Sequence, residues 1–289
     1  MKILVTGAKG QLGKKIIDIL GKDHQLVLTD FDNMDITDID IVKKVVEKEK
    51  PDYIIHAAAY TAVDKAEENV ELCRKINAIG AKNVATVAKE YDIKLIYIST
   101  DYVFDGKKNT PYSESDEPKP ISVYGLTKYE GEEFIRKICD KYYIIRVAGL
   151  FGELPAEHTG TNFVEAMLRL AGEKPNLNVV NDQIGSPTYT GDLAEIIAKI
   201  MTKTPEFGTY HFSGDGACSW YDFAKEIFLQ TKINVDLKPI TSNQYPQKAK
   251  RPRYSYLNKS KIENVLSIKA RPWQKMLAEY LSNRKNENY

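Results

Sequence analysis

The sequence has few cysteines and histidines, and they are scattered along the chain. Three cysteines in 289 residues is an odd number, and no two of them form a CxxC pair. This distribution excludes a disulfide framework and argues against a cysteine-bound metal. The four histidines include no HExxH pair, so no zinc site of that kind is expected. We therefore predict no metal site, and we expect a reduced, cytoplasmic setting.

The sequence also has no excess of charge of one sign and no long apolar run. Lys and Arg number 41 against 40 Asp and Glu, which argues against a nucleic-acid partner held by a broad basic field. No run approaches the roughly 20 apolar residues that a membrane span needs. The apolar run at the N-terminus is too short for a signal peptide. A hydrophobic share of 43% is enough for a packed core, so we expect a globular protein with neither a membrane nor a nucleic-acid partner.

Short apolar runs alternate with longer amphipathic ones up to residue 147. Runs of the first kind predict strands, and runs of the second kind predict helices. Continuous apolar strands separated by helices are typical of a parallel sheet covered on both faces. The sequence therefore predicts an α/β fold with a doubly wound, Rossmann-type parallel sheet. The expected strands are 2–6, 25–30, 52–59, 94–100 and 142–147, and the expected helices are 10–20, 39–48, 70–91 and 123–138.

The alternation becomes irregular after Phe151, where turn residues are denser. We expect a dinucleotide-binding domain over 1–150 and a smaller α/β substrate-binding lobe over 151–289. A segment near 178–203 is expected to return to the first domain. The expected elements of this part are a strand at 177–180 and helices at 192–201, 220–230 and 273–281.

Three glycines stand between the first expected strand and the first expected helix, in the segment TGAKGQLG. Gly7 permits a tight turn, Gly10 lets the backbone approach a pyrophosphate, and Gly13 permits close packing of helix on strand. The helix N-terminus then presents unpaired N–H groups to the phosphates. An ordinary strand–helix turn is the alternative, but the position in the first βαβ unit favours a dinucleotide site, which would also include Gln11 and Leu12.

An acidic residue at the end of the second strand bears on the choice of cofactor. Asp30 can accept hydrogen bonds from an adenosine ribose, and it would repel a 2′-phosphate. We therefore predict NADH as the cofactor, with NADPH as a second one. Asp32 is a competing candidate for the ribose, and a solvated turn acid is the alternative interpretation of Asp30. The other predicted cofactor contacts lie near the adenine and at the end of the third strand: Asp35, Ile36, Ala57, Ala58, Ala59 and Tyr60.

Tyr124 and Lys128 lie four positions apart on an expected helix, so their side chains share one face. An ammonium beside a phenol favours the phenolate and lowers a pKa that starts at about 10. A tyrosine with a lowered pKa can exchange a proton near neutral pH. A surface Tyr–Lys pair is the alternative. Thr100 ends the fourth strand, at the sheet edge where doubly wound folds bind ligands, and its hydroxyl can hold a substrate carbonyl beside the phenol.

Together, TGxxGxxG, the strand-end STD and YGxTK resemble the motifs of the extended short-chain dehydrogenase/reductase family. Longer segments resemble one branch of that family, the dTDP-4-dehydrorhamnose reductases, across nearly the whole chain. The segments STDYVFDG at 99–106 and NDQIGSPT at 181–188 are far more specific than the glycine triplet. The other matching segments are AAAYTAVDKAE (57–67), VYGLTKYEGE (123–132), NFVEAMLRLA (162–171) and RPRYSYLN (251–258).

The resemblance implies an NAD(P)H-dependent oxidoreductase of deoxysugar and cell-surface polysaccharide biosynthesis. Such an enzyme would reduce the C4 keto group of dTDP-4-dehydro-L-rhamnose to give dTDP-L-rhamnose. Tyr124 would protonate the C4 oxygen, Lys128 would lower the pKa of Tyr124 and hold the nicotinamide ribose, and Thr100 would orient the carbonyl. The implied contacts of the nucleotide sugar are Ala62, Val63 and Tyr102 at the sugar, Asn162 at the diphosphate, and Gln183 and Arg251 at the nucleotide.

Three positions leave alternatives open. Arg251 fits a solvated basic turn equally well, and Asn162 fits the N-cap of the helix that follows it. Members of the family often carry a tryptophan shortly after the strand that ends near Arg146, where this chain has Gly149. We therefore expect a wider sugar pocket or a different sugar.

Two other kinds of function are compatible with the same fold. A nucleotide-sugar dehydratase would place paired acids after the threonine of strand four, but Tyr102 follows Asp101 here, and an epimerase would recycle its cofactor within each turnover. A non-catalytic regulatory subunit, similar to the β subunit of methionine adenosyltransferase, would not need the set of Thr100, Tyr124 and Lys128. A monomer and a homodimer both remain compatible with the sequence.

Overall fold

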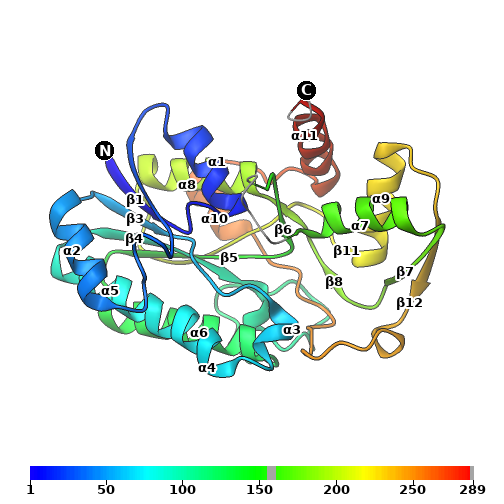
Figure 1. Ribbon diagram of the computed structural model, residues 1–289, viewed down its shortest axis with the longest axis horizontal. Helices are drawn as coiled ribbons and strands as arrows, with labels where there is room; N and C mark the ends of the chain where they lie inside the picture. The colour runs from blue at the N-terminus through cyan, green and yellow to red at the C-terminus, as the bar shows by residue number, and fades with distance from the viewer. Residues whose placement is uncertain (155–160, 287–289) are drawn as a thin grey trace.

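The computed structural model describes residues 1–154 and 161–286. Within them the chain forms a sheet of six strands in the order β10-β5-β4-β3-β1-β2, and all neighbouring pairs are parallel (Figure 1). The doubly wound fold predicted from the alternation is confirmed. The strands of this sheet are β1 (Lys2–Thr6), β2 (Gln25–Thr29), β3 (Tyr53–His56), β4 (Lys94–Thr100), β5 (Tyr142–Val147) and β10 (Gly208–Phe212).

The strand order reverses on either side of β1, which pairs with β2 at one edge and with β3 at the other. In doubly wound sheets, ligands bind at such a point, outside the carboxyl ends of the strands. β3 ends at His56, earlier than predicted, so that 57–59 leave the sheet as a loop over this edge. The edge therefore carries the glycine motif after β1, Asp30 after β2 and Thr100 at the end of β4.

Helices cover both faces of the sheet (Figure 1). On one face α1 packs against α8, and apolar side chains of both join those of β1 in one core. On the other face α2, α5 and α6 enclose a second core, which includes Val84, Leu95 and Ile144. The helices of these two layers are α1 (Gln11–Leu20), α2 (Ile39–Glu49), α5 (Ala81–Glu90), α6 (Val123–Ile138) and α8 (Thr190–Lys203).

The helix predicted over 70–91 is not regular. It consists of α4 (Val70–Arg74), a π-helical stretch (Lys75–Gly80) and α5. Gly80 lies so close to Ile36 that a Cβ built on it would be 2.7 Å from that side chain. The π-helical stretch also turns the buried Asn77 toward the catalytic edge of the sheet, where it bonds with Tyr60. Hydrophobic periodicity carries no information about such a local widening, which often occurs at functional sites.

A smaller lobe lies beyond the carboxyl edge of the sheet, where α7 and α9 flank a pair of parallel strands, β7 and β12 (Figure 1). The chain returns from this lobe through α8 to β10, which pairs with β5 as the sixth strand. The sequence reading missed β10 because its run GTYHF is short and includes polar residues. The division into 1–150 and 151–289 stays a prediction. The remaining elements are α3 (Val63–Ala66), β6 (Leu150–Phe151), α7 (Phe163–Glu173), β7 (Asn176–Val180), β8 (Ile184–Gly185), β9 (Thr188–Tyr189), β11 (Cys218–Ser219), α9 (Trp220–Thr231), β12 (Asp236–Ile240), α10 (Ser260–Leu266), α11 (Trp273–Asn286) and two 3₁₀ turns (Asp101–Val103, Ser242–Gln244).

Among the described residues, no helix combines the length and the apolar character that crossing a membrane would require.

Candidate active site

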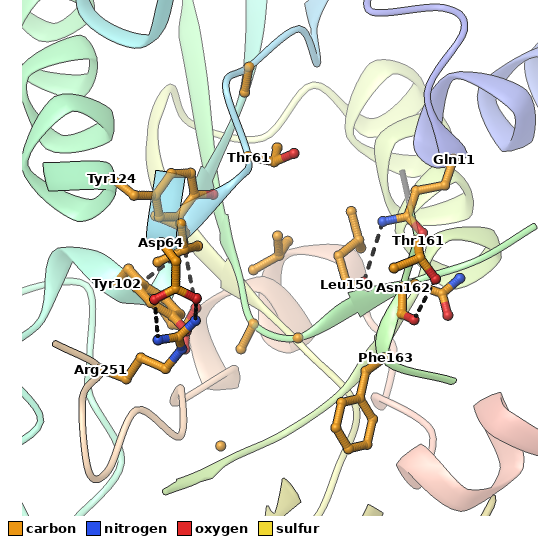
Figure 2. A pocket seen from close by; sticks show the side chains of 18 of the residues that line it. Gln11, Thr61, Asp64, Tyr102, Tyr124, Leu150, Thr161, Asn162, Phe163 and Arg251 are labelled. Atoms are coloured by element: carbon orange, nitrogen blue, oxygen red, sulfur yellow. Dashed lines mark hydrogen bonds and ion pairs between the residues drawn. The ribbon is translucent and has the colours of Figure 1, made fainter. Parts of the chain in front are cut away.

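A cavity of about 1770 Å³ extends from the carboxyl edge of the sheet into the smaller lobe. Figure 2 shows Tyr124, Tyr102 and Arg251 on one side of it and Gln11, Asn162 and Phe163 on the other. Of the predicted contacts, Tyr60 and Ala62 are not among the described residues that line it. The predicted residues that do line the cavity are Gly7, Gly10, Gln11, Leu12, Gly13, Asp30, Asp35, Ile36, Ala57, Ala58, Ala59, Val63, Thr100, Tyr102, Tyr124, Lys128, Asn162, Gln183 and Arg251.

The glycine motif forms a backbone cradle at one end of the cavity. Gly7 has a φ of +69°, and a Cβ built on it would lie 2.8 Å from the backbone of Ala58. A Cβ on Gly13 would lie 2.4 Å from the carbonyl oxygen of Ala8, so only glycine allows helix and turn to approach this closely. Gly10 is the N-cap of α1 and has no side chain to satisfy the first amides of that helix. These amides and the positive end of the helix dipole fit the pyrophosphate of a dinucleotide.

Asp30 and Asp32 follow β2 and lie beside this cradle, where they interact with Lys9. Asp30 lines the cavity and accepts hydrogen bonds from the backbone N–H groups of Lys9 (3.0 Å) and Phe31 (2.9 Å). Asp32 is exposed and pairs instead with the ammonium of Lys9 at 2.8 Å. The geometry therefore favours Asp30 over its competitor for the ribose. It also places the ammonium of Lys9, a residue of the glycine motif, at the same corner.

Asn77 connects the loop after β3 to α6. Its side-chain oxygen accepts a hydrogen bond from the backbone N–H of Tyr60 (2.8 Å), and its amide nitrogen donates to the carbonyl oxygen of Tyr60 (3.1 Å). The same nitrogen lies 3.3 Å from the hydroxyl of Thr127, directly before Lys128. Tyr60 therefore acts in the fold through its backbone. In the sequence, Asn77 is a polar residue between the apolar Ile76 and Ala78, and this pattern alone does not predict its contacts.

Thr100 and Tyr124 reach the cavity from two different elements. Thr100 ends β4, and its hydroxyl oxygen accepts a hydrogen bond from the backbone N–H of Tyr102 at 3.1 Å. Tyr124 lies in the first turn of α6, which Ser122 caps by accepting a hydrogen bond from the N–H of Gly125. The cap fixes where the helix begins, and thereby the position of the phenol over the strand end.

Lys128 lies one turn further along α6 and is buried. Its ammonium donates a hydrogen bond to the carbonyl oxygen of Ile98 (2.8 Å) and lies 4.0 Å from the centroid of the Tyr97 ring. Burial lowers the pKa of Lys128 to about 7, although the charge of Glu132 opposes the shift. The buried amine therefore changes its charge close to neutral pH.

The expected lowering of the pKa of Tyr124 is wrong for this structure. Burial raises the pKa of Tyr124 well above its usual value, and hydrogen bonding with Thr100 offsets only part of the rise. The charges of Asp101 and Tyr102 raise it further. Desolvation is the largest influence on the phenol, and the ammonium of Lys128 is directed to the carbonyl oxygen of Ile98, so Tyr124 keeps its proton at neutral pH.

Arg251 lines the cavity and is not the solvated turn that was the alternative. Its guanidinium donates two hydrogen bonds to the carboxylate of Asp64, at 3.1 and 2.7 Å, and its side chain is 13% exposed. Tyr102 also contacts it, since each changes the pKa of the other through a hydrogen bond. Figure 2 shows this group facing the cavity from the side of Tyr124.

Asn162 fulfils its alternative role as a helix cap. Its side-chain oxygen accepts a hydrogen bond from the N–H of Glu165 (3.0 Å), and its nitrogen donates to the carbonyl oxygen of Gly152 (2.8 Å). It nevertheless lines the cavity at the N-terminus of α7. A contact with a diphosphate would therefore involve a side chain that is already held on both sides.

Gly149 adopts a φ of +51°, and a Cβ built on it would lie 3.3 Å from Pro187 and 3.6 Å from the indole ring of Trp220. Trp220, the first residue of α9, lines the cavity and packs against Phe163 with ring centroids 4.6 Å apart. An aromatic wall therefore stands beside Gly149, supplied from another part of the chain. The sequence-based expectation of a wider pocket did not include this residue.

Among the described residues, no group of three or more His, Cys, Asp or Glu side chains is placed to hold a metal ion.

Comparisons with known proteins agree on one family. The family model described as the RmlD substrate binding domain matches residues 1–286. The chain is 41% identical to the dTDP-4-dehydrorhamnose reductase of Aggregatibacter actinomycetemcomitans, over 96% of this chain and 97% of the relative. Two crystal structures of dTDP-4-dehydrorhamnose reductases are similar along their whole length. That from Clostridium acetobutylicum has 44% identity and a TM-score of 0.93, covering 99% of this chain and 100% of the other.

The second structure, from Bacillus anthracis, is a complex with NADP. It has 40% identity and a TM-score of 0.92, and the alignment covers 98% of this chain and 99% of the other. The resemblance predicted from the motifs is thereby confirmed. The chain belongs to the RmlD family, the dTDP-4-dehydrorhamnose reductases of the extended short-chain dehydrogenase/reductase fold.

Proposed function

We propose that this protein reduces the C4 keto group of dTDP-4-dehydro-L-rhamnose to give dTDP-L-rhamnose, at the expense of NADH or NADPH. The observation that carries the proposal is the joint position of Thr100, Tyr124 and Lys128 on the wall of the cavity that also contains the glycine cradle. When bound in that cradle, the nicotinamide cofactor supplies the hydride. The chain supplies position, a proton and an enclosed site.

Tyr124 is suited to donate the proton. Because burial holds its pKa high, the phenol enters the reaction protonated, as the reduction of a ketone requires. Thr100 lines the same cavity, and its hydroxyl, which donates to the carboxylate of Asp101 at 3.1 Å in this structure, can donate to the carbonyl oxygen of a bound substrate. The two side chains together hold the oxygen on which negative charge develops.

Lys128 can stabilise the negative charge that develops on the carbonyl oxygen of the substrate. In its protonated form it places a positive charge in a dry environment next to the reacting groups, where electrostatic interactions are strong. We propose that it also binds the ribose next to the nicotinamide. Its hydrogen bond to the carbonyl oxygen of Ile98 fixes the amine near the end of β4.

For the cofactor, we propose that NADH is used at least as well as NADPH. Asp30 lines the cavity where an adenosine ribose would lie, and its carboxylate disfavours a phosphate on that ribose. The ammonium of Lys9 lies at the same corner, on Asp32, and can approach a 2′-phosphate. The two opposite charges support the use of both cofactors, with the carboxylate closer to the ribose.

For the nucleotide sugar, we propose that Val63 and Tyr102 border the sugar and that Gln183 and Arg251 contact the nucleotide. All four line the cavity, and Figure 2 shows Tyr102 and Arg251 across it from Gln11. Arg251 can contact a phosphate while it holds Asp64, because a guanidinium has five N–H donors and the carboxylate takes two of them. Trp220 would form the wall of the sugar pocket in place of a side chain at Gly149.

The test is the stoichiometry of the reaction. The purified protein should oxidise one NADH for each dTDP-4-dehydro-L-rhamnose consumed and should form dTDP-L-rhamnose. An epimerase or a dehydratase of this fold would recycle its cofactor and leave NADH unchanged. A regulatory subunit would show no turnover with any 4-keto nucleotide sugar, and either result would overturn the proposal.

A further inference from the structure

Glu132 is a buried carboxylate on the same face of α6 as Lys128. Glu132 lies one turn after Lys128 on the same helix, so the two side chains are neighbours. Its side chain is fully buried, and so is that of its partner Arg146 on β5. The guanidinium of Arg146 donates to both oxygens of Glu132, at 2.9 and 2.6 Å. Arg136 donates a further hydrogen bond at 2.6 Å from the solvent side.

One contact of Glu132 points at the strand that carries the reacting groups. The hydroxyl of Ser99 donates a hydrogen bond to Glu132 at 2.5 Å. Ser99 stands between Ile98, whose carbonyl oxygen holds the ammonium of Lys128, and Thr100. Ser99 is also the register partner of Arg146 across β4 and β5. A single carboxylate thereby ties α6 to both strands at the level of the active site.

We propose that Glu132 is a positioning residue of the reductase reaction. Its hydrogen bond with Ser99 fixes the end of β4. This strand end presents the carbonyl oxygen of Ile98 to Lys128, and it presents the hydroxyl of Thr100 to the substrate. The proposal rests on the proposed function, because it concerns how the same three side chains are held. A side chain that acted only in packing would not need a charge-assisted network of three donors around one carboxylate.

The charge of Glu132 has a second effect, on the amine itself. It raises the pKa of Lys128 against the lowering that burial causes. Arg146 and Arg136 keep the carboxylate ionised, since they lower the pKa of Glu132 to about 2. The titratable groups that interact with this pair from the surrounding elements are Cys73 on α4, Tyr97 on β4, Tyr129 on α6, Tyr142 on β5, His56 on β3 and His211 on β10.

The first experiment replaces Glu132 by glutamine and measures kcat and KM across pH. Glu132→Gln keeps the shape of the side chain but removes its charge. We expect kcat to fall about tenfold with KM for the nucleotide sugar nearly unchanged, because the loss concerns the reacting groups and not substrate binding. The alkaline limb of the kcat profile should move to lower pH by about one unit, since Lys128 loses its proton more readily without the nearby carboxylate.

The second experiment does not leave a buried charge unpaired, so it remains informative if Glu132→Gln fails to fold. Ser99→Ala removes only the hydrogen bond that reaches β4, and Arg136→Gln removes a contact of similar length on the other side of the carboxylate. We expect Ser99→Ala to lower kcat about tenfold and Arg136→Gln to leave it within about twofold. Equal effects of the two variants, or full activity with only a lower melting temperature, would overturn the proposal.

The outcome is separable from a failure of the proposed function. If the wild-type protein does not reduce dTDP-4-dehydro-L-rhamnose, the function itself is wrong. If the wild type is active and Glu132→Gln and Ser99→Ala keep its kcat and pH profile, the function stands and the positioning role of Glu132 is wrong.

Discussion

Arg251 donates two hydrogen bonds to the carboxylate of Asp64, and this pair links the loop after the 3₁₀ turn at Ser242–Gln244 to α3. The backbone N–H of Ala249 donates to the same carboxylate at 3.1 Å. The pair therefore holds a guanidinium in place on the wall of the cavity. Positioning of this kind lowers the entropy lost on binding.

Replacing Arg251 tests whether the guanidinium contacts the nucleotide. We expect Arg251→Lys to raise KM for the nucleotide sugar about tenfold with a smaller change in kcat, because a lysine cannot reproduce the two parallel hydrogen bonds. Lys250→Met, a change at the exposed neighbouring residue, is the matched control and should leave KM unchanged. Steady-state kinetics with varied nucleotide sugar decide between these outcomes. An unchanged KM in Arg251→Lys would show that the arginine serves only to hold Asp64.

Asp30 should set the choice between the two cofactors. We expect Asp30→Ala to raise the ratio of kcat/KM for NADPH to that for NADH about tenfold, since the variant loses both the bond to the ribose and the repulsion of a 2′-phosphate. Lys9→Met should shift the same ratio in the opposite direction, because it removes the nearby ammonium. A strong preference of the wild-type protein for NADPH would contradict the role assigned to Asp30.

Trp220 should define the sugar pocket. Truncation to alanine removes the indole ring that borders Gly149, so we expect Trp220→Ala to raise KM for the nucleotide sugar about tenfold and to relax discrimination among 4-keto sugars. The neighbouring Tyr221, which is not among the described residues lining the cavity, provides the control variant Tyr221→Phe. Identical KM values and identical sugar preference in Trp220→Ala and wild type would remove Trp220 from the pocket.

Two buried histidines should make the fold sensitive to acid. Burial lowers the pKa of His56 and of His211 from 6.5 to about 3, and the charges of Lys128 and Arg146, respectively, add to the effect. Between pH 6.5, the ordinary pKa of histidine, and pH 3, near the pKa in the folded protein, the unfolded chain binds more protons than the folded protein. The free energy of unfolding therefore falls as the pH is lowered from 6.5 toward 3. Each histidine contributes a slope of at most about 1.4 kcal/mol per pH unit.

Chemical denaturation at a series of pH values measures this slope. We expect His211→Gln to be less stable than the wild type at neutral pH but to lose stability more slowly on acidification. The glutamine can still donate to the carbonyl oxygen of Tyr112, which lies 3.1 Å from Nδ1 of the histidine. A slope equal to that of the wild type would show that His211 is protonated in both states or in neither.

Local patterns were enough to predict the parallel sheet, the glycine cradle and the three catalytic candidates. Each depends on residues close together in the sequence: an apolar run, a glycine spacing, or a Tyr–Lys pair on one helical face. The strand β10 was not predicted, because GTYHF forms a strand through its pairing with β5 and not through its own composition. The roles of Trp220 and Asn77 were not predicted for the same reason. Their partners, Gly149 and Tyr60, are distant from them along the chain.

The electrostatics of the site were the least predictable part. A Tyr–Lys spacing indicates that an amine is near the phenol, and it predicts a lower pKa for Tyr124. The extent of burial, which the spacing does not contain, raises that pKa instead. Glu132 lies in the segment 123–132, which indicated only a family resemblance. Its contacts with Ser99 and Arg146 form only when the fold brings α6, β4 and β5 together.

The most direct measurement compares the wild type with Tyr124→Phe and with Tyr129→Phe, a change of the same kind on the same helix outside the cavity lining among the described residues. Each is assayed for NADH oxidation with dTDP-4-dehydro-L-rhamnose. We predict that Tyr124→Phe lowers kcat by about a hundredfold or more, with cofactor binding retained, because the proton donor is lost. Tyr129→Phe should retain wild-type kcat. If Tyr124→Phe reduces the substrate as fast as the wild type, the assignment of this cavity as the reductase active site is contradicted.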